Sequence, residues 1–151
     1  MINKQLLLTA ATTSLILAGC SSAPSKRYTI DDDIAPDAPI SVEHIEDATP
    51  MYESYSLGGN SNYTLRGKDY TIIKEPKGFQ QQGIASWYGK KFHGHLTSNG
   101  EIYDMYSMSA AHKELPIPSY VKVTNKDNGK TAIVRVNDRG PFHEGRIIDL
   151  S

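Results

Sequence analysis

Apolar and polar residues alternate in two neighbouring segments in the second half of the chain, at residues 120–124 and 131–136. A period of two places the apolar side chains on one face of an extended strand. The tripeptide Asp127-Asn128-Gly129 separates the two segments, and Asn-Gly between two alternating runs is a strong signal for a tight turn. The pattern therefore predicts an antiparallel hairpin.

Shorter apolar runs predict further strands, at residues 83–88, 106–109 and 146–150. Residues 63–73 predict a small hairpin around a turn that contains Gly67. The run 110–112 is predicted as a single helical turn, because Pro116 stops a helix soon after it. Short strands, Gly-containing turns and the lack of a long helical period indicate an all-β barrel or sandwich.

The first twenty residues differ from the rest of the chain. Lys4 precedes an apolar run that is too short to span a bilayer comfortably and that ends in small residues, as a cleaved signal peptide does. The run ends in Leu17-Ala18-Gly19-Cys20, which resembles a lipobox, and Cys20 is the only cysteine. We therefore expect lipidation of Cys20; an ordinary secretory signal with a chance cysteine is the alternative.

The composition divides the chain into four parts. We expect a lipoprotein signal peptide at 1–19, a lipidated cysteine with a flexible acidic linker at 20–60, a small hairpin or extension at 61–82, and the β-barrel at 83–151. The linker is rich in Ser, Pro, Asp and Glu, and it lacks the apolar surface that would offset the entropy of ordering it.

The formal net charge is -1, which gives no electrostatic footprint for nucleic acid and no polybasic membrane patch. Acidic residues are concentrated before residue 54, whereas residues 54–151 carry nine acidic and thirteen Lys and Arg residues, a net of +4. A mildly basic domain would suit an anionic polymer, although an ordinary solvated surface explains the charge equally well.

Three polar segments interrupt the strand pattern, at 97–101, 110–116 and 136–141. They supply three groups that could transfer or orient a proton: Glu101, His112 and Asp138. Each also has a structural explanation, as a solvated turn residue, as a cap at a helix end, or as one half of a weak surface ion pair.

Taken together, the segments resemble one family. The matching motifs are ASWYG at 85–89, FHG at 92–94, TSNGE at 97–101, AAHK at 110–113, LPIPSY at 115–120, VTN at 123–125, VNDRGP at 136–141 and RIIDLS at 146–151. In order, spacing and identity they are similar to the rare lipoprotein A (RlpA) family, and more distantly to expansins and barwin-like proteins.

The resemblance implies a six-stranded double-psi β-barrel. Family members usually continue beyond the final Leu-Ser with an Ala-rich helix and closing strands, and often with a module that binds peptide-stripped glycan. We therefore expect a barrel that is truncated at its C-terminal end, with an unpaired edge.

The resemblance also implies an activity, that of an endolytic peptidoglycan transglycosylase, a carbon–oxygen lyase acting on polysaccharide. Such an enzyme cuts the β-1,4 bond between N-acetylmuramic acid and N-acetylglucosamine in peptide-poor glycan strands without adding water. The C6 hydroxyl of the muramic acid closes on its own C1 and leaves a 1,6-anhydro end. One group can act first as acid and then as base, because the nucleophile belongs to the substrate.

By position, the catalytic groups of the family fall on Glu101, His112 and Asp138. We assign Asp138 as the general acid/base; a nearby carboxylate such as Glu101 would keep it protonated, and His112 would hydrogen-bond one of the two acids. The roles of Asp138 and Glu101 could be exchanged. Asp149 is a further candidate.

Substrate contacts are expected from Tyr88 and Phe92, whose rings could stack on sugars, and from Asn99 and Arg139. Aromatic residues are equally often part of a core. His93 and His95 would share one face of a strand, but they lack a persuasive third ligand, so we expect neither a metal ion nor another cofactor.

These expectations place the protein at the periplasmic face of the outer membrane, held by the lipid on Cys20 and bound to peptidoglycan glycan strands. The serine after Cys20 favours the outer over the inner membrane, and the sequence indicates no particular protein partner. Two alternatives remain: a non-catalytic, expansin-like glycan-binding lipoprotein of the cell envelope, and a structural lipoprotein that tethers membrane to wall.

Overall fold

The computed structural model describes residues 27–37, 41 and 45–151. The predicted signal peptide and the lipidation site at Cys20 lie outside these residues. Within the described ranges, no helix is long and apolar enough to cross a membrane.

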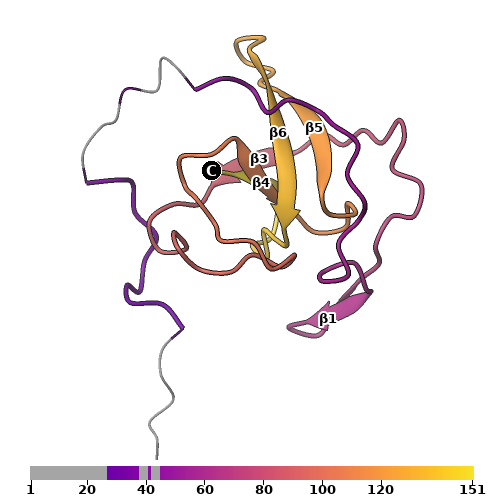
Figure 1. The fold of residues 1–151 in the computed structure, drawn as a ribbon, viewed down its shortest axis with the longest axis horizontal. Helices are drawn as coiled ribbons and strands as arrows, with labels where there is room; N and C mark the ends of the chain where they lie inside the picture. Colours follow the sequence, from indigo (N-terminus) through magenta and orange to yellow (C-terminus); the bar gives the residue numbers. More distant parts are fainter. Residues whose placement is uncertain (1–26, 38–40, 42–44) are drawn as a thin grey trace, which may run out of the picture.

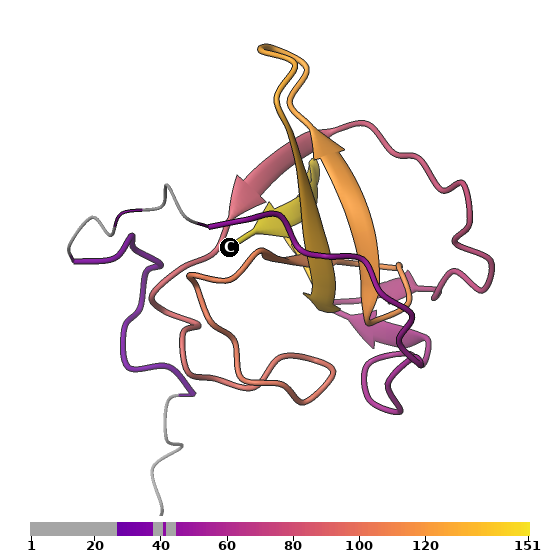
Figure 2. The same cartoon turned by 45° about the horizontal axis from the view of Figure 1, so that its top comes forward.

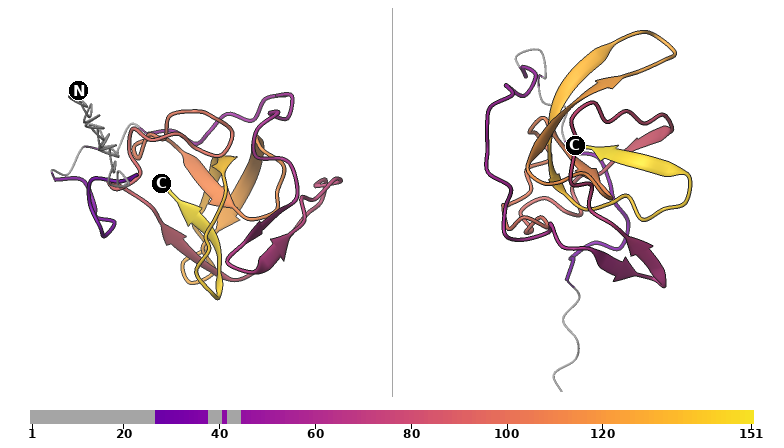
Figure 3. Two further views of the ribbon diagram at one scale, coloured as in Figure 1. Left: turned by 90° about the horizontal axis from the view of Figure 1, so that it is seen from below. Right: turned by 90° about the vertical axis from the view of Figure 1, so that its right-hand side faces the viewer.

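In the part of the chain that the structure describes, seven strands form two sheets; Figure 1 shows their arrangement. The strands are β1 (Tyr63–Leu65), β2 (Lys68–Tyr70), β3 (Ile84–Trp87), β4 (Ser109–His112), β5 (Ser119–Thr124), β6 (Thr131–Asp138) and β7 (Arg146–Leu150). β1 pairs with β2, and the other five form a mixed sheet in the order β3-β7-β4-β6-β5. This sheet curls strongly, as the two views of Figure 3 show, so the predicted all-β barrel architecture is confirmed in a half-closed form.

Both predicted hairpins are present. β5 and β6 pair antiparallel, with Val121 opposite Val134 and Val123 opposite Ala132, which keeps the alternating apolar side chains on one face. β1 and β2 are joined by a two-residue turn in which both Arg66 and Gly67 have a positive φ, as a type I′ turn requires.

The prediction of a helical turn at 110–112 is wrong, because these residues belong to β4. The strand pairs parallel with β6 on one side and antiparallel with β7 on the other, and all four of its residues are buried. Pairing on both sides satisfies the backbone groups that a helical turn would satisfy locally. Small side chains allow the neighbouring layers to approach closely. The strand predicted at 106–109 begins only at Ser109.

β4 separates two apolar clusters, because its successive side chains point to opposite faces. Ala110 belongs to the larger cluster, which also contains Leu115, Ile117, Val134, Val136 and Ile148. Ala111 belongs to the smaller cluster with Tyr88 and Tyr103, whose rings stack at 4.1 Å. Of the candidate catalytic groups, His112 lies on β4, Asp138 at the end of β6 and Glu101 in a loop outside the strands.

Residues 45–60, which we call the strap, have no regular secondary structure but lie along β6 and the start of β5 (Figure 2). The amide of Ala48 donates to the carbonyl of Ile133 at 2.9 Å, and the amide of Ser56 donates to that of Ile117 at 3.0 Å. The strap is thus attached at both ends, and its middle residues lie next to β6.

Candidate functional site

A tight loop at residues 96–102 positions one side of the site. An isolated bridge pairs Leu96 with Ile102, and the amide of Gly100 donates to the carbonyl of Thr97 at 3.0 Å. Gly100 has a φ of 89°, a backbone conformation that only glycine adopts without strain. The turn directs both Ser98 and Glu101 toward β6.

Asp138 lies at the end of β6 and is held by this loop. Its Oδ1 accepts three hydrogen bonds: from the amide of Ser98 at 2.8 Å, from the hydroxyl of Ser98 at 2.6 Å and from the amide of Arg139 at 2.8 Å. No residue that the structure describes donates to Oδ2. A cavity of about 370 Å³ is lined in part by the neighbours Ser98 and Arg139, together with Tyr63 and Phe142; Asp138 itself is not among its lining residues.

Glu101 is bound on the face of β6 that carries Arg135 and Asn137. The Arg135 guanidinium donates to its two carboxylate oxygens at 2.7 and 2.8 Å, the amide nitrogen of Asn137 donates at 2.9 Å and that of Asn99 at 2.8 Å. These hydrogen bonds, above all those from Arg135, lower the pKa of Glu101 to about 2. Glu101 is therefore a carboxylate at neutral pH.

Arg135 also binds an acid that the sequence analysis assigned to the linker. Its guanidinium donates to the two carboxylate oxygens of Glu53, in the strap, at 2.8 and 2.7 Å. The hydroxyl of Tyr120 donates to the same carboxylate at 2.6 Å. Hydrogen bonds from Arg135, and next those from Tyr120, lower the pKa of Glu53. The hydrogen bonds that Arg135 makes to Glu53, and next those to Glu101, raise the pKa of Arg135. One guanidinium thus joins the strap to the candidate site.

His112 is buried on β4, with both ring nitrogens engaged. Nδ1 accepts from the amides of Glu114 at 3.1 Å and Leu115 at 3.0 Å, and Nε2 lies 3.0 Å from the side-chain oxygen of Gln81. Because Nδ1 accepts from two amides, it carries no proton, and the proton of the neutral ring is on Nε2. Nε2 therefore donates to Gln81. Burial, followed by the charges of Arg139 and Lys113, lowers the pKa of His112 to about 4.

The 96–102 loop contains Glu101 and donates hydrogen bonds to Asp138, so the structure brings these two acids near each other. His112 is linked to Asp138 only by contacts of the backbone. Ala111, next to His112, pairs with Asp138 across β4 and β6. The Arg139 guanidinium donates to the carbonyl of His112 at 3.0 Å, while the Arg139 amide donates to Asp138. The expected hydrogen bond from the His112 ring to a carboxylate is not among the bonds of the described residues.

The residues expected to contact substrate have varied environments. Tyr88 is buried in the smaller cluster, and Phe92 is half-buried with its ring 5.1 Å from that of Tyr28. Asn99 holds Glu101. Arg139 donates to the carbonyls of Gly59 at 2.9 Å and Leu115 at 2.6 Å, so its guanidinium is occupied in joining the strap to β4.

Asp149, the further candidate, is buried on β7 and bound by the guanidinium of Arg146, whose Nε lies 3.2 Å from Oδ1. Burial raises its pKa. The two histidines considered as metal ligands contact different residues. Nδ1 of His93 accepts a hydrogen bond from the amide of Met105, and the His95 ring packs on Tyr28. Within the ranges that the structure describes, no cluster of three potential metal ligands occurs.

Two residues of the site were missed by the sequence analysis, Arg135 and Glu53. Arg135 occupies an outward position of an alternating strand, where a charged residue is ordinarily solvated. Glu53 is separated from Arg135 by eighty-two positions, in a segment whose composition resembles a linker. No local pattern of this segment marked the contact, since its tyrosines at positions 52 and 55 remain exposed.

Comparison with known proteins matches residues 80–151 to a family model described as lytic transglycolase. The chain is 78% identical over 137 residues to a Vibrio cholerae protein named endolytic peptidoglycan transglycosylase RlpA, covering 91% of this chain and 52% of that protein. Proteins of the same name from Pseudomonas aeruginosa and Neisseria meningitidis are 56% and 57% identical, over 79% and 70% of this chain and 35% and 44% of theirs. The chain thus spans about half or less of these relatives.

Proposed function

Because the chain belongs to the rare lipoprotein A (RlpA) family, we propose that it acts as an endolytic peptidoglycan transglycosylase. Its substrate is the peptide-poor glycan strand, and its products carry 1,6-anhydro-N-acetylmuramic acid ends. The relatives bear this activity in their names, and the matched region, residues 80–151, contains Glu101, His112 and Asp138.

The observation that carries this proposal is the environment of Asp138. One carboxylate oxygen is fixed by three neutral donors, which orients the group, and the other accepts no hydrogen bond from the described residues, at a strand end whose neighbours Ser98 and Arg139 line a cavity. A general acid needs this arrangement, because one oxygen must reach the glycosidic bond while the carboxyl group as a whole keeps its orientation.

In the proposed reaction, Asp138 Oδ2 carries the proton and donates it to the glycosidic oxygen as the bond to C1 breaks. Positive charge builds on the sugar ring. The C6 hydroxyl then forms a bond to C1 and releases its proton to the Asp138 carboxylate, which restores the starting state. No water is consumed, and the nucleophile is already held next to C1 by the substrate itself.

Glu101 has a different role in this scheme. With a pKa of about 2 it has no proton to donate at neutral pH, which favours Asp138 over Glu101 as the acid. Its fixed negative charge would stabilise the positively charged sugar ring, since it is held in place by Arg135 and Asn137. His112, neutral at this pH, would position the β4 end of the site.

We further propose that Cys20 carries the lipid anchor and holds the protein at the periplasmic face of the outer membrane, within reach of the glycan. The lipobox-like Leu17-Ala18-Gly19-Cys20 supports this placement. Metabolic labelling with a fatty-acid analogue should modify the wild type and leave Cys20→Ser unlabelled. Labelling of that variant would contradict the anchor.

Digestion of peptide-free glycan strands tests the activity. The full-length wild type should release products with anhydro ends, identified by mass spectrometry. Asp138→Asn should lower the rate by about 10²–10⁴-fold, whereas Asp127→Asn, an exposed turn residue, should behave as wild type. Strands that bind the wild type but remain intact would contradict the proposal and identify the protein as a non-catalytic glycan-binding lipoprotein.

A further inference from the structure

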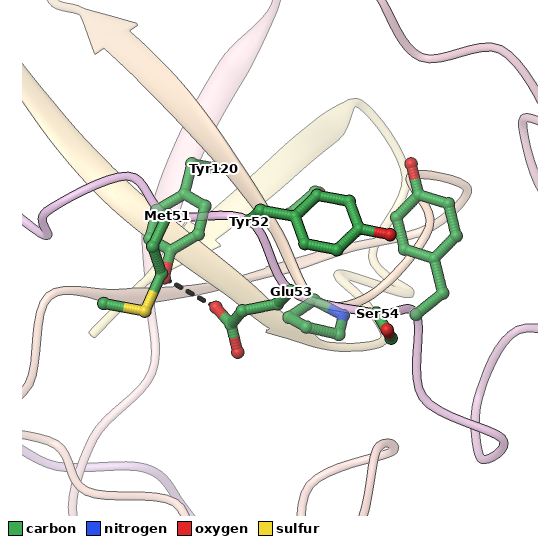
Figure 4. A pocket seen from close by; sticks show the side chains of 8 residues that line it. Met51, Tyr52, Glu53, Ser54 and Tyr120 are labelled. Atoms are coloured by element: carbon green, nitrogen blue, oxygen red, sulfur yellow. Dashed lines mark hydrogen bonds between the residues drawn. The ribbon is translucent and has the colours of Figure 1, made fainter.

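A groove of about 390 Å³ lies between the strap and the start of β5. We call it the strap groove and define it by Tyr52, Glu53, Tyr55, Ser119 and Tyr120, which are among its lining residues. Figure 4 shows the rings of Tyr52 and Tyr120 near the Glu53 carboxylate, and the hydrogen bond that joins this carboxylate to Tyr120. The groove is outside the site assigned to catalysis.

Two of the three tyrosines of the groove, Tyr52 and Tyr55, are exposed. Tyr52 is 95% exposed and Tyr55 51%, in a strap that is fixed by backbone hydrogen bonds at Ala48 and Ser56. Exposed aromatic groups held in a fixed frame are typical of a binding surface. A tyrosine ring offers an apolar face and a polar edge, and this combination matches a sugar ring with its C–H face and equatorial hydroxyls.

Polar groups suited to sugar hydroxyls accompany the rings. The carboxylate of Glu53 and the hydroxyl of Tyr120 are joined at 2.6 Å, and both line the groove. A few polar groups among aromatic ones provide the orientation that a small-molecule or saccharide site needs.

The strap groove and the candidate catalytic site are linked by one side chain. Arg135 binds Glu53 on the groove side and Glu101 on the catalytic side. A linear polymer that binds at Glu101 and continues past Arg135 would reach the groove.

We propose that the strap groove is a distal saccharide subsite, in which Tyr52 and Tyr55 contact sugar rings of the glycan strand beyond the cleaved bond. The inference rests on the proposed function, because it takes the same polymer as its ligand. Its consequence is a preference for long strands over short fragments, since only a long strand occupies both places.

Binding to an inactive protein tests the subsite. In the Asp138→Asn background, affinity for long peptide-free strands and for a tetrasaccharide fragment would be measured with and without Tyr52→Ala or Tyr55→Ala. Each tyrosine variant should weaken binding of long strands about three- to tenfold and leave the tetrasaccharide unaffected. Leu57→Ala is the matched control, since Leu57 is a fully exposed strap residue outside the groove.

Equal weakening by Leu57→Ala, or unchanged binding of long strands in both tyrosine variants, would overturn the subsite. Digestion by the protein with an intact Asp138 is followed in parallel, and the absence of anhydro-ended products would overturn the proposed function. Even without cleavage, a loss of affinity for long strands in Tyr52→Ala but not in Leu57→Ala would support saccharide binding in the groove. Failure of the subsite and failure of the proposed function can therefore be told apart.

Discussion

The two carboxylates of the site have opposite environments, although both lie within reach of the same loop. Glu101 is bound by a guanidinium and two side-chain amides, whereas Asp138 accepts only from uncharged groups and through one oxygen. Hydrogen bonds from a charged donor are roughly twice as strong as those from neutral donors, and they keep Glu101 ionised. The assignment of acid/base to Asp138 and of fixed charge to Glu101 follows from this difference.

At the same scale, His112 predicts a pH dependence of stability. Its pKa is about 4 in the folded protein, against 6.5 for an unperturbed histidine, so the unfolded chain takes up a proton first as the pH falls. The stability that the neutral ring contributes is present above pH 6.5 and is lost between pH 6.5 and 4, by an amount on the order of 3 kcal/mol.

Denaturant unfolding of the wild type and of His112→Asn at pH 7, 5.5 and 4 checks this loss. Asparagine can still accept the amides of Glu114 and Leu115 but does not titrate. The variant should be less stable at pH 7, and its difference from the wild type should shrink as the pH falls. A difference that is constant over this range would contradict the neutral, buried histidine.

At the scale of elements, the 96–102 loop and the strap hold the side chains of the candidate site in position. The loop depends on the positive φ of Gly100. Gly100→Ala should cost about 1–2 kcal/mol of stability through backbone strain, because no atom lies close enough to clash. It should also lower transglycosylase activity by shifting Ser98 and Glu101.

Gly129→Ala is the matched control for this change, since Gly129 also has a positive φ and open space around it but lies in the β5–β6 turn. It should show the same loss of stability in thermal unfolding and retain the activity of the wild type. Equal activity of the two alanine variants would show that the loop geometry does not matter for the reaction.

The attachment of the strap to β6 is expected to depend on the ion pair of Glu53 with Arg135. Glu53→Gln removes the charge that fixes Arg135 on the strap side, so the amides of Ala48 and Ser56 should exchange faster with solvent and kcat should fall several-fold, with a smaller change in KM. Glu46→Gln, at an exposed strap residue, should change neither quantity. If amide exchange and kcat were unaltered in Glu53→Gln, the strap would have no influence on the site.

The sequence predicted those elements whose signals are local. Asn128-Gly129 between alternating strands and Gly67 in a short turn specify their hairpins within a few residues. β4 was misassigned because the short run Ala110-Ala111-His112 has no distinct period, and pairing with strands on both sides decided its conformation. The contact of Glu53 with Arg135 depends on the tertiary fold alone, so no local pattern could indicate it.

At the scale of the whole molecule, a curled sheet presents the candidate catalytic loop at one end, and the strap packs beside it. The described strap residues are held by β6 and by Tyr120 of β5.

The central claim, an intramolecular cleavage with Asp138 as acid and base, is tested most directly by digestion in ¹⁸O-labelled water. We predict anhydro-ended products from the wild type that contain no label, and no products above background from Asp138→Asn. Incorporation of one labelled oxygen per cleaved bond would show hydrolysis, and it would contradict the mechanism derived from this site.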